Sequence, residues 1–426
     1  MEEQIETPHL GGAIVDLFAG GGGASLGIRW ATGREPDLAA NHCMHAIRVH
    51  ALNHPRTIHL REDVRGIDPA AYLQGQQVDL VWLSPDCTHF SRAKGGAPRS
   101  QGIRGLAWVA LDWAKARSPR LICLENVPEF EGWGPLDDDG RPIRERAGET
   151  FRDFVAALEA EGYAVEWRTL CAADYGAPTT RRRLFLVARR DGRPRWPVPT
   201  HGPGRASPWR TAAEVIDWSL PCPSIFDRAR PLAEPTQRRI AEGVRRYVLG
   251  AARPFVVRVG HHLLAPTLIQ TGYGEGPGPL PRALDLRAPL GTVVGGGQKH
   301  GLVSAMLARH APAALPQPPA VRAGEVAAFL MRYYGQGGQW SALQEPLPTV
   351  VSRDRFALVT VHVDGEPLVV ADIGMRMLQP HELAAAQGFP ADYRWEGTKA
   401  ERVARIGNSV CPQVAAALVA ANMEEA

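Results

Sequence analysis

The sequence predicts an α/β protein: a largely parallel sheet with helices on both faces, plus a smaller, irregular and β-rich domain. Short apolar runs at 13–18, 78–83, 121–124 and 184–188 alternate with helix-like stretches such as 106–116 and 150–161. Such alternation is typical of a parallel sheet covered by helices. Residues 191–370 differ, being rich in Pro, Gly and Arg. We therefore expect domains at 11–190 and 191–370, followed by a helical segment at 371–426.

Composition supports a globular chain. Of its 426 residues, 45% are apolar and 22% are charged, which excludes a mostly disordered protein. The net charge is only +3, but 191–370 holds 20 basic against 13 acidic side chains. This excess indicates either a nucleic-acid contact or a solvated basic surface.

The sequence indicates neither a membrane-spanning segment nor a metal-binding site. No apolar run has the length of a bilayer span, and the acidic start MEEQIETPH does not resemble a secretion signal. The six cysteines are scattered without CxxC spacing, so we expect no disulfide framework and no zinc site. We expect a reducing, cytoplasmic location.

The irregular stretch contains an internal echo. PLGTVV at 289–294 recurs as PLPTVV at 346–351, and each copy precedes a second apolar run. We predict two related strand–turn–strand units there.

A glycine cluster follows the first apolar run. Asp16-Leu17-Phe18-Ala19 leads into four glycines at 20–23, where a helix begins. Glycines allow a ligand to approach the backbone, and a helix N-terminus offers free N–H groups. The pattern suits a nucleotide-like cofactor, although Ser25 breaks a GxGxxG fingerprint and a plain tight turn is the alternative.

Three other strand ends carry reactive groups. Cys87 in Ser84-Pro85-Asp86-Cys87 is a candidate nucleophile, or else a small buried residue. Glu125 in Glu-Asn-Val follows the run 121–124 and is a candidate acid, or else a helix cap. Alternation places Arg181 and Arg183 on one strand face, where they suit phosphate or base contacts, or form a solvated edge.

Taken in this order, the elements resemble the DNA (cytosine-5) methyltransferase family. Asp16–Gly23 resembles its cofactor loop, Pro85-Asp86-Cys87 its Pro-Pro-Cys, and Glu125-Asn126-Val127 its ENV tripeptide. Arg181 and Arg183 match its Gln-x-Arg-x-Arg motif. Two C-terminal blocks also match: Arg376…Glu382…Gln387-Gly388-Phe389-Pro390, and Gly407-Asn408-Ser409-Val410. The resemblance covers both ends of the chain.

The resemblance implies a Rossmann-like catalytic domain, a target-recognition domain at 191–370, and a 371–426 segment that returns to the catalytic domain. The activity would be methyl transfer from S-adenosylmethionine to C5 of a flipped-out cytosine in a specific double-stranded DNA sequence, leaving S-adenosylhomocysteine. Cys87 would attack C6 and Glu125 would hold N3. Arg183 would contact O2, and Arg181 would help to order the site.

The resemblance also implies a cofactor set and a DNA-contacting loop. The residues at cofactor-binding positions are Asp16, Phe18, Ala19, Gly20, Gly22, Gly23, His42, Asp63, Pro85, Asn408 and Ser409. The segment 91–105 is polar, Gly-rich and basic, as a loop that closes on DNA should be. Its candidate DNA contacts are Ser91, Arg92, Lys94, Arg99 and Arg104.

Four departures mark a divergent branch. His42 stands where the family has the acid that binds the ribose, and Asp86 replaces the second proline beside the nucleophile. Thr88 and Thr179 replace glutamines. A carboxylate beside a thiol tends to raise the pKa of that thiol. His42 leaves open a modified donor such as carboxy-S-adenosylmethionine.

Several alternatives remain. One is a catalytically silent DNA-binding homologue, which the intact Cys87, Glu125 and Arg183 argue against. An RNA cytosine methyltransferase is another, but the long segment 191–370 favours DNA. A nicotinamide-dependent oxidoreductase would leave these residues unexplained. We expect a monomer in a bacterial or phage-infected cell, with a cognate restriction endonuclease as a candidate partner.

Overall fold

The computed structural model describes residues 11–73, 75–86, 105–272, 281–309, 318–334 and 360–423. The chain divides into two compact units. The first unit comprises Met1–Arg210, Pro289–Gly297 and Leu383–Ala426, and the second unit comprises Thr211–Ala288 and Gln298–Glu382. These ranges place the divisions near 210 and 382, whereas the sequence placed them near 190 and 370.

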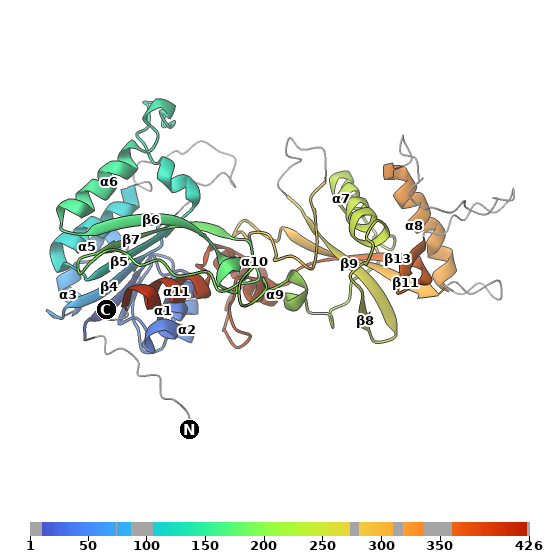
Figure 1. The fold of residues 1–426 in the computed structure, drawn as a ribbon, viewed down its shortest axis with the longest axis horizontal. Helices are drawn as coiled ribbons and strands as arrows, with labels where there is room; N and C mark the ends of the chain where they lie inside the picture. The colour runs from blue at the N-terminus through green and yellow to red at the C-terminus, as the bar shows by residue number, and fades with distance from the viewer. Residues whose placement is uncertain are drawn as a thin grey trace, which may run out of the picture. The chain divides into compact units, whose positions relative to one another are not determined.

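The first unit is built on a seven-stranded sheet of order β3-β2-β1-β4-β5-β7-β6 (Figure 1). β1 to β5 run parallel, and β7 is antiparallel to both β5 and β6. In chain order the strands are β1 (Ala13–Leu17), β2 (Leu38–Ala40), β3 (Ile58–Leu60), β4 (Val78–Leu83), β5 (Leu121–Asn126), β6 (Ala164–Cys171) and β7 (Arg182–Arg189).

The strand order reverses between β1 and β4. Their ends are in register, because Leu17 pairs with both Ala40 and Leu83. The carboxyl ends of β1, β2 and β4 therefore lie along one edge of the sheet. In open α/β sheets such a switch point is where ligands bind.

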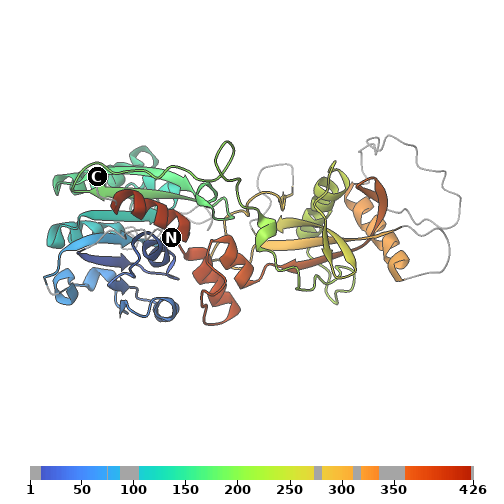
Figure 2. The same cartoon turned by 60° about the horizontal axis from the view of Figure 1, so that its bottom comes forward.

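Alternate residues of the strands pack on opposite faces. Val15, Val81 and Ile122 belong to one buried cluster, which also includes Trp113 of α5 and Phe154 of α6. Ile14, Leu80 and Leu121 belong to another, with residues of α1 and α11. The sheet is thus covered on both sides, as Figure 2 also shows. The short apolar runs of the sequence are buried strands for this reason.

The helices of the first unit include α1 (Gly23–Thr32), α2 (Met44–Asn53), α3 (Pro69–Leu73), α5 (Val109–Arg117), α6 (Glu149–Ala160), α10 (Lys399–Asn408) and α11 (Pro412–Met423); α9 (Pro380–Ala386) crosses the division at 382. Short 3₁₀ turns lie at Val64–Gly66, Gly105–Trp108, Pro128–Gly132, Arg144–Arg146 and Ala172–Tyr175.

One helical run in the described part of the chain, Lys399–Met423, has the length and mean hydropathy of a membrane span. In its most apolar window, 61% of the residues are buried inside protein. The run also divides into α10 and α11 at 409–411. A buried core helix passes the same test, so this run is weak evidence for a membrane span.

The second unit contains a six-stranded antiparallel sheet of order β10-β9-β11-β13-β12, with β8 on β9. Its strands are β8 (Val257–Val259), β9 (His262–Gln270), β10 (Ala283–Leu284), β11 (His300–Arg309), β12 (Thr360–Val363) and β13 (Glu366–Met377). α7 (Glu234–Val244), the π-helical turn Arg245–Leu249 and α8 (Pro318–Tyr334) share its buried core, and a 3₁₀ turn lies at Ala212–Val215.

A buried ion pair closes the C-terminal end of the second unit. Arg376 at the end of β13 donates two hydrogen bonds to Glu382, at 2.7 and 2.8 Å. Glu382 also accepts from the backbone N–H of Asp217 at 2.8 Å. Both charges are buried, and a buried pair of this kind needs such additional partners. Arg376 and Glu382, which were noted in the sequence, therefore form a buried structural ion pair.

The internal echo does not form the predicted strand at its first copy. Residues 289–294 make only an isolated bridge, between Leu290 and Thr179, and belong to the first unit. Gly291 and the glycines at 295–297 favour an open loop over a strand, and the first unit takes the backbone bonds of Leu290. The second copy lies outside the described residues.

Candidate active site

Strand ends place most of the predicted site residues along one edge of the sheet of the first unit. Phe18 follows β1, His42 follows β2, Asp63 follows β3, Pro85 follows β4, and Glu125 lies near the end of β5. Parallel strands bring these ends together although the residues are far apart in sequence.

The glycine loop is fixed by its neighbours at this edge. The backbone N–H of Ala19 donates to the carbonyl of Ala40 at 3.0 Å, and Asn41 Nδ2 donates to the carbonyl of Ala19 at 3.2 Å. Phe18 adopts a left-handed backbone with φ of 60°, and Gly22 has φ of 86°. A non-glycine residue in this region is uncommon and is held by surrounding contacts.

A buried polar chain lies beneath the loop. Ser25 Oγ donates to Asp16 Oδ2 at 2.6 Å and contacts His50 Nε2 at 2.8 Å; His50 Nδ1 contacts His59 Nε2 at 2.8 Å. Which nitrogen of each histidine donates depends on the tautomer of its ring. The chain thus orders Asp16 behind the loop.

Burial sets the protonation of this chain. Burial raises the pKa of Asp16 to about 7 and lowers the pKa of His50 to about 3. It also lowers the pKa of His54, which directly follows the last residue of α2, to about 3. Both histidines are therefore neutral at pH 7.

The C-terminal segment supports the loop from outside. Tyr393 Oη donates to the carbonyl of Gly21 at 2.7 Å and lies 3.3 Å from His54 Nε2. A Cβ on Gly21 would lie 2.6 Å from Ser409 Oγ, so Ser409 packs directly against the loop. Ser409 is buried, whereas its neighbour Asn408 is exposed. Residues distant in sequence therefore determine the shape of this loop.

His42 and Asp63 lie at neighbouring strand ends and are both exposed. Asp63 accepts hydrogen bonds from the backbone N–H and from the side chain of Arg65, and these lower the pKa of Asp63 to about 2. His42 adds a small effect in the same direction. Asp63 is therefore ionised, as an acceptor for an amino group should be.

The end of β4 is held by two side chains. Trp82 Nε1 donates to Ser84 Oγ at 3.0 Å, and Asn126 Nδ2 donates to the carbonyl of Pro85 at 3.3 Å. Asp86 is exposed. Cys87 and Thr88 lie outside the described residues, as do Ser91, Arg92, Lys94, Arg99 and Arg104. The structure nonetheless fixes the residues that lead to Cys87.

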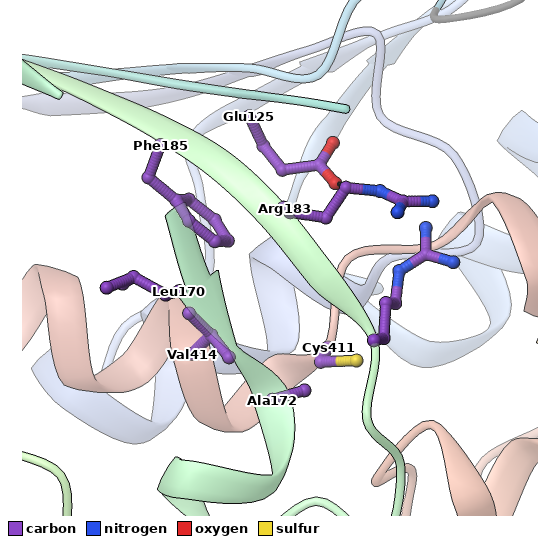
Figure 3. A pocket seen from close by; sticks show the side chains of 8 residues that line it. Glu125, Leu170, Ala172, Arg183, Phe185, Cys411 and Val414 are labelled. Carbon is purple, nitrogen blue, oxygen red and sulfur yellow. Dashed lines mark ion pairs between the residues drawn. The ribbon is translucent and has the colours of Figure 1, made fainter. Parts of the chain in front are cut away.

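Glu125 and Arg183 form an ion pair. Arg183 Nε lies 3.2 Å from Glu125 Oε1, with both side chains mostly buried. The two charged groups lie side by side (Figure 3). They line a small pocket of about 10 Å³, which has room for a single water molecule. Arg181 and Cys411 line the same pocket. A carboxylate and a guanidinium held together in this way can bind a planar group with both donors and acceptors.

Arg181 contacts backbone rather than a carboxylate at its Nη1. This atom donates to the carbonyl of Val293 and to the carbonyl of Gly407, each at 3.0 Å. Arg181 is only 3% exposed. It thus ties β7 to two segments far away in the sequence.

The sequence missed several residues at the site. These are the supporting residues Ser25, His50, His54, His59 and Tyr393, the segment Pro289–Gly297, and Cys411. His50 and His54 carried a signal, since a spacing of four predicts neighbouring side chains on a helix, although α2 ends at Asn53 and His54 follows it. The other residues gave none, because their neighbours come from other parts of the chain. Burial raises the pKa of Cys411 to about 11, so its thiol is unsuited to be a nucleophile.

No group of three or more His, Cys, Asp or Glu is arranged to hold a metal ion within the described ranges.

The sheet order and its ligand edge define a Rossmann-like methyltransferase fold. Two solved structures share it: a variant of Spodoptera frugiperda DNMT2 (TM-score 0.52, 14% identity, 97% of this chain and all of that one) and S. pombe Dnmt2 methyltransferase (TM-score 0.51, 12% identity, 96% of this chain and 97% of that one).

The chain belongs to the C-5 cytosine-specific DNA methylase family, a family of DNA (cytosine-5) methyltransferases, whose model matches residues 12–201 and 322–424. It is 32% identical over 200 residues to the Type II methyltransferase M.AgeI of Thalassovita gelatinovora, covering 45% of this chain and 43% of that protein. It is 29% identical over 246 residues to M.AquIA of a Picosynechococcus species, covering 53% and 96%. The match thus spans less than half of the first relative and nearly all of the second.

Proposed function

We propose that this protein transfers a methyl group from S-adenosylmethionine to C5 of a cytosine in a specific double-stranded DNA sequence. The observation that carries the proposal is the buried Glu125–Arg183 pair, held beside the strand end that leads to Cys87. Family membership supports the same reaction.

The charged pair suits the edge of a cytosine. In the proposed mechanism Glu125 accepts from the exocyclic amine and holds a proton at N3, while Arg183 donates to O2. Cys87 forms a covalent bond to C6, which makes C5 nucleophilic enough to take the methyl group. A base then removes the C5 proton and Cys87 leaves. A stacked base exposes none of these atoms fully, so the target must be flipped out of the duplex.

The described residues fit S-adenosylmethionine as the donor, which supplies an electrophilic methyl group when bound. α1 begins at Gly23 without a side-chain cap, so its first N–H groups suit a carboxylate. A Cβ at Gly20 would meet no atom within 4 Å, so the loop is open there. Ionised Asp63 suits the adenine amine, and we assign Phe18, which follows β1, as the residue that stacks on the adenine ring.

We assign sequence recognition to the second unit, and DNA contact to the basic loop residues beyond Cys87. The relatives M.AgeI and M.AquIA are named Type II methyltransferases. This supports a place in a restriction–modification system with a cognate endonuclease. DNA methylated by this protein would then resist that nuclease.

The test is direct. Purified protein is incubated with S-adenosylmethionine and unmethylated genomic DNA, and the nucleosides are analysed by mass spectrometry. We expect 5-methylcytosine from the wild type and none from Cys87→Ser, with DNA binding retained. Equal product from both proteins would contradict the mechanism. Product from neither would indicate a silent DNA-binding protein.

His42 motivates one second candidate, a donor with an additional carboxylate. The exposed imidazole stands at the end of β2, where an acid would repel such a group. Repeating the assay with carboxy-S-adenosylmethionine decides between the two donors by the mass added to cytosine. A gain of one methyl group from ordinary S-adenosylmethionine, and no product from the carboxylated donor, would exclude this candidate.

A further inference from the structure

The segment Pro289–Gly297, which we name the strap, is a loop of the first unit that lies in sequence between two parts of the second unit. It is pinned to the residues just before β7. Leu290 donates its backbone N–H to the carbonyl of Pro178 at 2.9 Å, and its own carbonyl accepts from Thr180 at 2.8 Å. Leu290 and Val293 are each 1% exposed, so the apolar side chains of the strap are buried in the protein.

The other side of the strap contacts the end of α10. A Cβ on Gly295 would lie 2.5 Å from Asn408 Oδ1, and a Cβ on Gly407 would overlap the backbone of Val294 and Gly295. The two backbones therefore approach each other as closely as glycine allows. An added atom at Gly407 must therefore move one of the two segments, whereas an added atom at Gly295 meets only the exposed side chain of Asn408, which can turn away.

One nitrogen of Arg181 connects the strap with the end of α10. Its Nη1 donates both to Val293 in the strap and to Gly407 in α10. A buried guanidinium is costly without acceptors, and these carbonyls supply them. Arg181 lies two residues before Arg183 in the chain, and it lines the same pocket as Arg183 and Glu125. Movement of the strap would therefore displace the start of β7 and, with it, the charged pair.

We propose that the strap is the element that positions the Glu125–Arg183 pair, with Gly407 as the residue against which the strap packs and Arg181 as the positioning residue that links the strap to the pair. The proposal rests on the function proposed above for that pair. It adds a part of the catalytic apparatus that lies outside the motifs of the sequence.

Two glycines of this region give a matched pair of variants. Gly407→Ala adds an atom against the backbone of Val294 and Gly295, whereas a Cβ at Gly296 would meet nothing within 4 Å. Neither glycine has a positive φ, so alanine strains neither backbone. We expect kcat of Gly407→Ala to fall about 10- to 100-fold, as for a small misplacement of reacting groups. Gly296→Ala should match the wild type in kcat and in KM for S-adenosylmethionine.

A double-variant cycle shows whether Arg181 and the strap act together. Arg181→Lys alone should lower kcat, and Arg181→Lys combined with Gly407→Ala should lose little more than the worse single variant. Losses in kcat that multiply would mean that the two residues act independently, which would overturn the proposal. A Gly407→Ala protein with the kinetics of Gly296→Ala would also overturn it.

Two further measurements separate the possible failures. Amide hydrogen exchange at Thr180 needs no turnover. It should quicken in Gly407→Ala and not in Gly296→Ala, since Leu290 accepts that N–H. If the wild type is inactive but shows this exchange pattern, the proposed function is wrong while the packing of the strap is as described. If Gly407→Ala does not fold, Leu290→Val loosens the same packing by one buried methylene. A folded Leu290→Val protein with wild-type kcat and exchange would overturn the proposal.

Discussion

At the scale of residues, Glu125 shows how a strand end specifies chemistry. Its carboxylate is paired with Arg183 at 3.2 Å. Glu125→Gln keeps the shape of the side chain and removes its charge and its acid–base function. We expect kcat to fall by about 10²- to 10⁴-fold, the usual contribution of a general acid or base, with little change in cofactor affinity. Steady-state kinetics measure this, and exposed Glu145→Gln is the control. A loss below tenfold would remove Glu125 from the mechanism.

The buried histidines predict how stability depends on pH. His54 has its pKa lowered to about 3 in the folded protein, so between pH 6.5 and 3 the unfolded chain binds a proton that the folded protein does not. The free energy of unfolding therefore falls as pH falls through that window, by up to about 1.4 kcal/mol per pH unit for one such group.

His54→Gln should reduce this acid sensitivity. The measurement is urea unfolding at pH 7 and at pH 5. His45→Gln is the control, since His45 is an exposed histidine on α2. Asp16 acts in the opposite sense, because a raised carboxyl pKa costs stability as pH rises from about 4 to about 7. An unchanged pH dependence in His54→Gln would show that His54 is not the buried neutral group described above.

Part of the candidate site follows from residue types and strand-end positions. Phe18 closes one apolar run and Glu125 follows another, and such runs end at one edge of a parallel sheet. Arg183 begins the antiparallel β7 at the same edge, and Asp63 was predicted from the resemblance to the family. His59 and Tyr393 were not predictable in this way. Their roles come from burial against Asp16 and the glycine loop, and no local pattern records such contacts.

At the scale of elements, glycines of the same loop serve two purposes: one allows a backbone conformation, and another leaves space for a ligand. Gly22 has φ of 86° and packs against Tyr393, so Gly22→Ala should lower the free energy of unfolding by about 1–3 kcal/mol. A Cβ on Gly20 meets no protein atom, so Gly20→Ala should leave stability unchanged and weaken binding of S-adenosylmethionine. Thermal unfolding and calorimetric titration of both variants test this. Unchanged binding in Gly20→Ala would place the cofactor elsewhere.

The strap shows where element prediction fails. The apolar residues of 289–294 suggested a strand, and apolar content alone does not distinguish a strand from a seated loop. What decides is which partners satisfy the backbone groups, and here Pro178 and Thr180 do so from another part of the chain. By contrast, the helix predicted at 150–161 is present as α6, since its apolar spacing matches one buried face.

At the scale of the whole molecule, the basic excess between 191 and 370 predicts salt-dependent DNA binding. Each phosphate neutralised by Lys or Arg releases counterions, so the logarithm of affinity should fall linearly with the logarithm of salt concentration. Fluorescence anisotropy of labelled duplex DNA between about 50 and 200 mM salt measures the slope. Binding of S-adenosylmethionine is the control and should change little. DNA affinity independent of salt would mean that this charge is only a solvated surface.

The position of the strap in the sequence affects how the assigned recognition unit could be exchanged between related proteins. The unit to which we assign recognition is two inserts, Thr211–Ala288 and Gln298–Glu382, rather than one. A chimaera that exchanges 211–382 as a single block replaces the strap as well, and gives the host's Arg181 a foreign partner. A chimaera of two separate grafts leaves the host's Pro289–Gly297 in place. We therefore expect sequence specificity to transfer when the two segments are grafted separately and the host protein keeps its own strap between them.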